Sequence, residues 1–128
     1  MHKKKILVID DESGFTEMVK LNLEATGEYV VIVENRGITA MERILTYRPD
    51  LVLLDVILPD MEGPDIVRQI REHSETRQLP VIFLTATVTR QEVQEQQGYI
   101  GGHRFLAKPG TVHELMDSIR SELLQYPD

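Results

Sequence analysis

The sequence contains four places where charged or hydroxyl side chains directly follow an aliphatic run. They are Asp10, Asp11 and Glu12 after Ile6 to Ile9, Asp55 after Leu51 to Leu54, Thr85 after Val81 to Leu84, and Lys108 with Pro109 after Arg104 to Ala107. Crowded carboxylates repel one another and raise each other's pKa unless a cation lies between them. Ligands made of oxygen alone favour a hard divalent ion such as Mg²⁺, with Mn²⁺ as a substitute. We therefore predict a magnesium site if the fold brings the acids together.

The same residues have the chemistry that phosphoryl transfer needs. A carboxylate is a competent nucleophile toward phosphorus, and Asp55 is the acid that stands alone after its apolar run. Lys108 and a metal ion together would offset the charge on the phosphoryl oxygens, and the Thr85 hydroxyl could donate to one of them. Taken singly, such residues are more often helix caps or solvated surface groups. The hypothesis therefore depends on their convergence in space.

Convergence requires a particular arrangement of strands and helices. Five aliphatic runs, at 6–9, 29–33, 51–54, 81–84 and 104–107, alternate with amphipathic stretches. The third run has no polar alternation, which is typical of a parallel strand buried on both faces. Five strand–helix units predict a three-layer α/β domain with right-handed crossovers. Ligands bind at the carboxyl ends of the strands in such sheets, where all four polar groups would lie.

The stretches between the runs carry helix signals of unequal strength. Apolar residues recur at helical spacing in three of them, at Phe15, Met18, Val19 and Leu23, at Ile38, Met41, Ile44 and Leu45, and at Ile66, Val67 and Ile70. Gly27 and Arg48-Pro49-Asp50 mark the ends of the first two helices. Residues 90–97 are nearly all polar, so we expect packing to stabilise a helix there only weakly. Thr111 and Glu114 have capping-box spacing before the last helix.

Length and composition limit the class of protein. A chain of 128 residues has room for one domain, 1–128, and not for a second. A formal net charge of −7 argues against direct binding to nucleic acid. The lack of cysteine excludes a disulfide framework and a thiolate zinc site. Because no apolar stretch is long enough for a signal peptide or a membrane span, we expect a cytoplasmic protein without membrane contact.

Together these segments resemble the receiver domain of bacterial two-component response regulators. The resemblance rests on Ile6–Glu12, Leu51–Asp55, Leu58–Gly63, Thr85–Ala86 and Phe105–Pro109, which follow the order and nearly the spacing of that family. It implies a flavodoxin-like (βα)5 fold with strand order 2-1-3-4-5. It also implies a signalling domain, not an enzyme, whose Asp55 takes a phosphoryl group from a sensor histidine kinase or a histidine phosphotransfer protein.

The resemblance assigns a metal site as well. It implies that Mg²⁺ is held by the carboxylates of Asp10, Asp11 and Asp55 and by the backbone carbonyl of Ile57. The family often has a polar residue or Met where this chain has Ile57. That position borders the route of water to the phosphoryl group in this family, so it bears on the lifetime of the phosphorylated state.

Further roles concern the phosphoryl group and its readout. The resemblance implies phosphoryl contacts from Lys108, Thr85 and Ala86, a switch formed by Thr85 and Phe105, and a candidate cis peptide at Pro109. It places an output face, for an effector or a second copy of the domain, on the fourth helix, the fifth strand and the fifth helix. Residues 98–103 are more glycine-rich than usual in the family.

Two other functions compete with this one. A phosphatase of the haloacid-dehalogenase type also uses a strand-end aspartate, but it places an acid two residues later, where this chain has Ile57. A receiver-like domain that only docks and is never phosphorylated is the second alternative. Modification by a small phosphodonor in the presence of Mg²⁺ discriminates between docking and phosphoryl transfer. No glycine-rich phosphate loop is present, which disfavours nucleotide enzymes.

The four histidines and the basic start of the chain are interpreted as surface residues. The histidines His2, His73, His103 and His113 have no metal-ligand spacing, and we expect all four at the surface. Lys3 to Lys5 are interpreted as a solvated lead into the first strand, with an electrostatic docking element as the alternative.

Overall fold

The computed structural model describes residues 2–86, 99–100, 103–108 and 111–125. Its sheet contains six strands in the order β2-β1-β3-β4-β6-β5. The strands are β1 (Lys4–Ile9), β2 (Tyr29–Glu34), β3 (Leu51–Asp55), β4 (Val81–Thr85), β5 (Tyr99–Ile100) and β6 (His103–Ala107). All pairs among the five longer strands are parallel, which confirms the flavodoxin-like order 2-1-3-4-5 with β6 as the fifth strand. The two-residue strand β5 runs antiparallel to β6 and is not predicted by the sequence.

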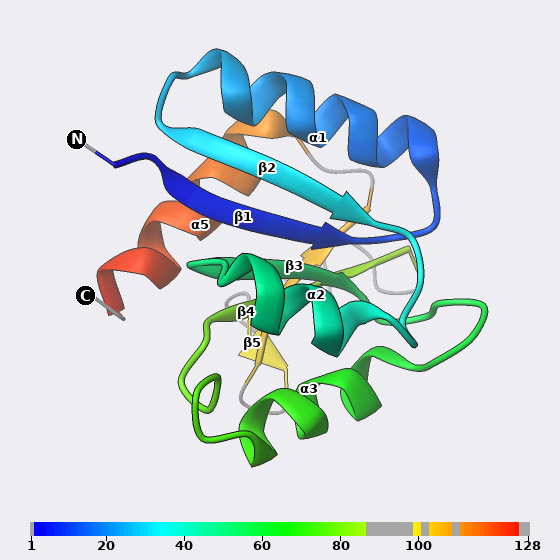
Figure 1. Ribbon diagram of the computed structural model, residues 1–128. Helices are drawn as coiled ribbons and strands as arrows, with labels where there is room; N and C mark the ends of the chain where they lie inside the picture. Colours follow the sequence, from blue (N-terminus) through cyan, green and yellow to red (C-terminus); the bar gives the residue numbers. More distant parts are fainter. Residues whose placement is uncertain (1, 87–98, 101–102, 109–110, 126–128) are drawn as a thin grey trace.

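Helices cover both faces of the sheet (Figure 1). Those in the described residues are α1 (Ser13–Ala25), α2 (Ala40–Tyr47), α3 (Gly63–Glu72) and α5 (Val112–Gln125). Side chains of α1 and α5 pack on one face, and side chains of α2 and α3 pack on the other. The predicted three-layer arrangement is therefore confirmed. The polar helix predicted at 90–97 lies outside the described residues.

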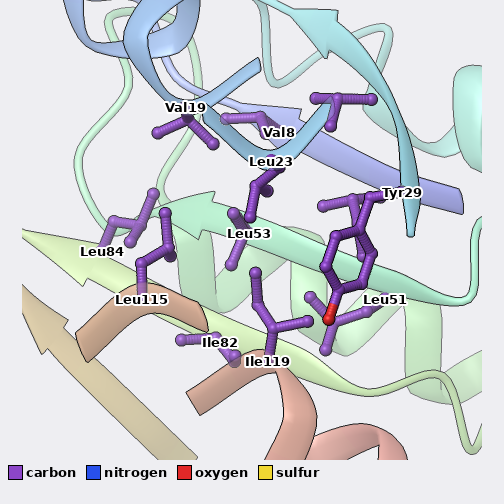
Figure 2. Close-up of a cluster of buried hydrophobic side chains, with 12 residues drawn as sticks. Val8, Val19, Leu23, Tyr29, Leu51, Leu53, Ile82, Leu84, Leu115 and Ile119 are labelled. Carbon is purple, nitrogen blue, oxygen red and sulfur yellow. The ribbon is translucent and has the colours of Figure 1, made fainter. Parts of the chain in front are cut away.

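Strand β3 contributes to two separate cores. Leu51 and Leu53 pack toward α1 and α5, where they meet Ile119 (Figure 2), whereas Val52 and Leu54 pack toward α2 and α3. All residues of β3 are buried because helices cover both sides of the strand. Each fully buried aliphatic side chain contributes roughly 1.5–3 kcal/mol to folding. This two-sided burial fixes the position of the polar residue at the end of the strand.

The helix boundaries agree with most of the sequence signals. Helix α5 begins at the predicted capping box, in which the Glu114 N–H donates to Thr111 Oγ1 at 3.0 Å and the Thr111 N–H donates to Glu114 Oε1 at 3.3 Å. Ile38 is the exception, because it precedes α2 and is 72% exposed instead of lying on the buried face of the helix. In this loop its backbone N–H donates to Oδ2 of Asp60 at 2.9 Å.

The outer edge of β2 is bonded to α1. The Val31 N–H donates to Glu24 Oε2 at 3.0 Å, and the Val31 carbonyl accepts from Lys20 Nζ at 2.7 Å. Lys20 and Glu24 also pair with each other at 3.0 Å. The bond from the Val31 N–H, followed by that from Lys20, holds the pKa of Glu24 below its usual value. These contacts fix the register of α1 along the strand.

The remaining surface residues follow expectation only in part. His2 and His113 are exposed, whereas His73 is half-buried at the end of α3, where its Nδ1 accepts from the Glu75 N–H at 3.4 Å. The side chain of His103 is not among those described. In the part of the chain that the structure describes, no helix has the length and apolar character needed to cross a bilayer.

Candidate functional site

Three carboxylates meet at the carboxyl ends of β1 and β3. Asp10 directly follows β1, and Asp55 is the last residue of the neighbouring strand β3. Each of Asp10, Asp11 and Asp55 offers one oxygen such that these atoms lie within 4.8 Å of one another. Asp10 and Asp55 are buried, and Asp11 is exposed. The convergence on which the sequence hypothesis depends is thus present for all three acids.

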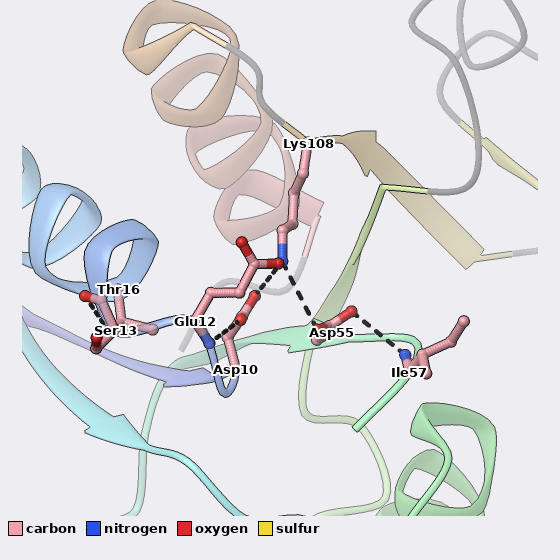
Figure 3. Close-up of polar contacts among 7 residues, drawn as sticks. All are labelled: Asp10, Glu12, Ser13, Thr16, Asp55, Ile57 and Lys108. Atoms are coloured by element: carbon pink, nitrogen blue, oxygen red, sulfur yellow. Dashed lines mark hydrogen bonds and ion pairs between the residues drawn. The ribbon is translucent and has the colours of Figure 1, made fainter. Parts of the chain in front are cut away.

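Lys108 reaches the same cluster from the end of β6 (Figure 3). Its Nζ lies 2.8 Å from Asp10 Oδ2, 2.7 Å from Glu12 Oε1 and 3.6 Å from Asp55 Oδ2. The side chain is only 5% exposed, and Nζ lies 4.8 Å from the centroid of the Phe15 ring. The ammonium group is therefore enclosed between an aromatic face and three carboxylates.

The titration of these groups reflects their burial. Desolvation raises the pKa of Asp55 above its ordinary value of 3.8, and the negative charge of Asp10 raises it further, against the opposing effects of Lys108 and the Ile57 N–H. Burial alone would lower the pKa of Lys108, but hydrogen bonds to Asp10 and Glu12 and the nearby negative charges together outweigh burial and raise it above 10.5. Lys108 is therefore a cation at neutral pH.

The loop between β3 and α3 folds back on Asp55. The Ile57 N–H donates to Asp55 Oδ1 at 3.3 Å, and the Gly63 N–H donates to the Val56 carbonyl at 2.7 Å. A Cβ at Gly63 would lie 2.9 Å from the Asp55 carbonyl oxygen, so only glycine permits this close return. The Ile57 side chain is 60% exposed, and Ile57 lies two residues after Asp55 in the chain.

The residues predicted to contact or read a phosphoryl group lie on β4 and β6. Thr85 is the buried last residue of β4, and its carbonyl accepts from the Lys108 N–H at 2.7 Å; Ala86 follows it and is exposed. The Phe105 ring stacks on Phe83, with centroids 4.9 Å apart and planes at 29°. Phe105 therefore packs against the core shared with α2 and α3. Pro109 lies outside the described residues.

Sequence reasoning missed two contacts of Lys108. Glu12 appears in the sequence only as a third acid after the first apolar run; its side chain makes no capping bond on α1 and pairs with Lys108. Phe15 is predicted only as a residue of the apolar helix face, yet its ring lies beside the Lys108 ammonium. The pattern of α1 places Phe15 on the inner face, and no local signal shows what it meets there.

The donor set fits a hard divalent cation. Three carboxylate oxygens lie within 4.8 Å of one another, and two of the three side chains are buried, so each charge opposes the others. Lys108 offsets part of this charge from one side. Three carboxylate ligands suit a small divalent ion that keeps several of its bound waters. The arrangement can thus bind a cation next to Asp55.

A doubly wound parallel sheet with an acidic pocket and a lysine at its carboxyl edge defines the class of protein. The family description "Response regulator receiver domain" matches residues 6–120, and the chain belongs to this family. It is 34% identical to the response regulator ArlR of Staphylococcus saprophyticus over 96% of this chain and 54% of that protein. It is 33% identical to the alkaline phosphatase synthesis transcriptional regulatory protein PhoP of Bacillus subtilis over 94% of this chain and 48% of that protein. The chain thus spans about half the length of these curated relatives.

Solved structures share the fold over nearly the whole chain. A putative response regulator from Chloroflexus aurantiacus has a TM-score of 0.81 at 28% identity and covers 96% of this chain and 99% of its own. The chemotaxis protein CheY4 of Vibrio cholerae has a TM-score of 0.80 at 27% identity and covers 95% of this chain and 100% of its own. These likenesses agree with the strand order of the sheet.

Proposed function

We propose that this receiver domain accepts a phosphoryl group on Asp55 from the phosphohistidine of a sensor histidine kinase or a histidine phosphotransfer protein. One observation carries the proposal: Asp55 ends a central strand beside a second buried carboxylate, an exposed one and an enclosed lysine ammonium. Membership of the receiver family supports the same role. The domain is a signalling component in this proposal and not an enzyme acting on a separate substrate.

The reaction is a transfer between two nucleophiles. An Asp55 carboxylate oxygen attacks phosphorus, and a new O–P bond forms while the P–N bond to the donor imidazole breaks. The electron pair of that bond leaves with the imidazole, which takes a proton from water. Lys108 Nζ, 3.6 Å from Asp55 Oδ2, stays protonated and offsets the charge that the phosphoryl oxygens bring into the site.

We further propose that Asp10, Asp11, Asp55 and the backbone carbonyl of Ile57 hold Mg²⁺ during this step. When bound, Mg²⁺ supplies positive charge to the phosphoryl oxygens and relieves repulsion among the carboxylates. Mn²⁺ has the same preference for oxygen ligands and should substitute. The support is the chemistry of the donor set, in which all three side-chain ligands are carboxylates.

The readout of phosphorylation is proposed to run from Thr85 to Phe105. A phosphoryl group on Asp55 offers a strong acceptor to the Thr85 hydroxyl, and together with Lys108 and Ala86 this group would hold the phosphoryl oxygens. Phe105 lies one strand away, stacked on Phe83 in the same layer of the core. A shift at Thr85 can therefore change how the Phe105 ring packs. This change would alter the proposed output face, formed by the fourth helix, β6 and α5, where an effector or a second copy would bind.

Phosphodonor labelling tests the proposal directly. The protein is incubated with an acyl phosphate and Mg²⁺, and its intact mass is measured. We expect the mass of the parent to increase by one phosphoryl group. The control variant Asp50→Asn should gain the same mass, because the Asp50 carboxylate lies at the opposite end of the sheet, where it accepts from the Lys5 N–H. We expect no adduct for Asp55→Asn. An equal adduct on Asp55→Asn would assign the phosphoryl group to another residue, and an unmodified parent would favour the docking-only alternative.

A further inference from the structure

The loop that carries Ile57 is fixed at its base by the backbone but needs a second anchor at its tip. At the base, the Gly63 N–H bonds to the Val56 carbonyl, and Ile57 and Glu62 form an antiparallel bridge. Residues 58–61 extend beyond this bridge. Leu58 is buried and supplies an apolar contact. The distance between this tip and the loop after β2 therefore depends on the contacts of the polar side chains at the tip.

Asp60 provides that polar anchor with both oxygens of its carboxylate. Oδ1 accepts from the Gly37 N–H at 2.9 Å, and Oδ2 accepts from the Ile38 N–H at 2.9 Å. Gly37 and Ile38 belong to the loop between β2 and α2, more than twenty residues away in sequence. The bonds from Ile38 and Gly37 hold the pKa of Asp60 below its ordinary value of 3.8, so the carboxylate is ionised at neutral pH.

The two loops also interlock at a glycine. A Cβ at Gly37 would lie 2.7 Å from Met61 Cβ, 3.1 Å from Ile66 Cδ1 and 3.3 Å from Asp60 Oδ1. Real Cβ atoms do not approach a neighbour as closely as the first of these distances. Any larger residue at position 37 must therefore push the two loops apart at the place where Asp60 binds.

The loop that receives Asp60 is itself braced. Glu34 Oε1 accepts from the Asn35 N–H at 3.0 Å and from the Arg36 N–H at 3.2 Å, and Glu34 Oε2 lies 3.4 Å from Arg43 Nε. Glu34 ends β2, and Arg43 belongs to α2. The β2–α2 loop is thus tied to a strand and a helix, so a contact with it can hold the more extended β3–α3 loop in place.

We infer that Asp60 is a positioning residue for the metal and phosphoryl site: its two bonds to Gly37 and Ile38 order the loop that carries Ile57. Asp60 acts on the site indirectly, through the backbone between residues 57 and 60, and not by binding the metal itself. The inference rests on the proposed function, because the ordered loop supplies the carbonyl of Ile57 as a ligand. Preordering of a ligand group increases affinity because binding no longer has to supply the ordering.

The test compares Asp60→Asn, Asp60→Ala and Gly37→Ala with the parent, with Asp50→Asn as a matched control. The Asp50 carboxylate also accepts a hydrogen bond from a backbone N–H, that of Lys5 at 2.7 Å, but it lies at the other end of the sheet. The first readout is amide hydrogen exchange of Ile57 and Gly63 in metal-free protein, and the second is the Mg²⁺ dissociation constant from calorimetry. Neither readout requires phosphorylation, so both remain valid if the parent takes no phosphoryl group and the proposed acceptor role of Asp55 fails.

We expect both amides to exchange faster in the Asp60 and Gly37 variants and Mg²⁺ to bind about fivefold more weakly to Asp60→Ala. Asp60→Asn keeps one side-chain oxygen acceptor, so its loss should be smaller than that of Asp60→Ala. A pure charge effect would make these two variants equal and would leave Gly37→Ala unchanged, and that result would overturn the inference. Parent-like exchange and affinity in all three variants would overturn it as well.

Discussion

Asp55 is a residue whose ionised form is opposed by its own surroundings. Burial and the charge of Asp10 raise its pKa above 3.8, which means that the folded chain binds a proton here more readily than the unfolded chain does. We therefore expect Asp55→Asn to stabilise the metal-free protein at neutral pH by about 1 kcal/mol, a shift of about 4 °C in melting temperature. Thermal unfolding in a chelator is the measurement.

The stability difference between Asp55→Asn and the parent should depend on pH. The parent loses stability as the pH rises from below 3.8 through the raised pKa of Asp55, and the asparagine variant has no such loss. The advantage of Asp55→Asn should thus be absent in acid and complete above the raised pKa. Mg²⁺ should reduce it by offsetting the charge of the parent. Glu17→Gln, at an exposed site on α1, serves as the control. A variant no more stable than the parent at neutral pH would contradict the account.

Asp11 and Glu12 are adjacent acids with different surroundings. An oxygen of Asp11 lies within 4.8 Å of oxygens of Asp10 and Asp55, whereas Glu12 pairs with Lys108. We expect Asp11→Ala to weaken Mg²⁺ binding about tenfold or more, and Glu12→Ala to have a smaller effect. Calorimetric titration of both variants decides the point, and an Asp11→Ala affinity equal to that of the parent would remove Asp11 from the proposed ligands.

At the scale of elements, β4 and β6 follow β3, which ends at the proposed acceptor Asp55, in the sheet and carry the aromatic pair Phe83 and Phe105. Thr85 ends β4, and Phe105 on β6 stacks on Phe83 two residues before Thr85. With a non-hydrolysable phosphoryl mimic bound at Asp55, we expect changed hydrogen-exchange protection in peptides that contain Thr85 and Phe105, because Thr85 gains a new acceptor. Asp55→Asn with the same mimic is the control. Unchanged protection in the parent, with the mimic demonstrably bound, would remove this coupling.

The elements show which features a sequence can predict. Leu51 to Leu54 could be assigned to a central parallel strand because burial on both faces removes polar alternation from the sequence itself. Strand β5 could not, since two residues carry no periodicity. Ile38 fits the apolar spacing of α2, but the helix begins only at Ala40, so Ile38 lies in the loop before it, where its N–H donates to Asp60. Periodicity alone does not fix where a helix begins.

The same distinction separates the site residues that the sequence could place from the contacts that it could not. Asp10, Asp55, Thr85 and Lys108 could be placed together because each lies at the last residue of a parallel strand or directly after it, and the carboxyl ends of such strands share one edge. The partners of Lys108 depend on side-chain reach across that edge, so neither Glu12 nor Phe15 could be paired with it in advance. The contacts of Asp60 join two loops distant in sequence, and an aspartate after a proline has many ordinary explanations.

At the scale of the whole molecule, ion binding at the carboxyl edge of the sheet bears on the stability of the entire domain. The carboxyl edge of the sheet carries the acid cluster, in a chain with a net charge of −7. A divalent cation that binds only the folded chain stabilises all of it through mass action, by about 1.4 kcal/mol at ten times its dissociation constant. If the proposed Mg²⁺ binds the acid cluster, it should stabilise both cores, since β1 and β3 contribute to each of them and lead to the cluster.

The contacts of Lys20 and Glu24 with Val31 have a consequence for encounters between molecules. β2 is an edge strand, and free N–H and carbonyl groups on such an edge can pair with a strand of another chain and start aggregation. Here both groups of Val31 are occupied by α1, so an incoming strand finds the ladder interrupted midway along β2. We expect Lys20→Ala with Glu24→Ala to aggregate faster than the parent on mild heating, as followed by light scattering. Scattering identical to that of the parent at equal thermal stability would show that α1 does not protect this edge.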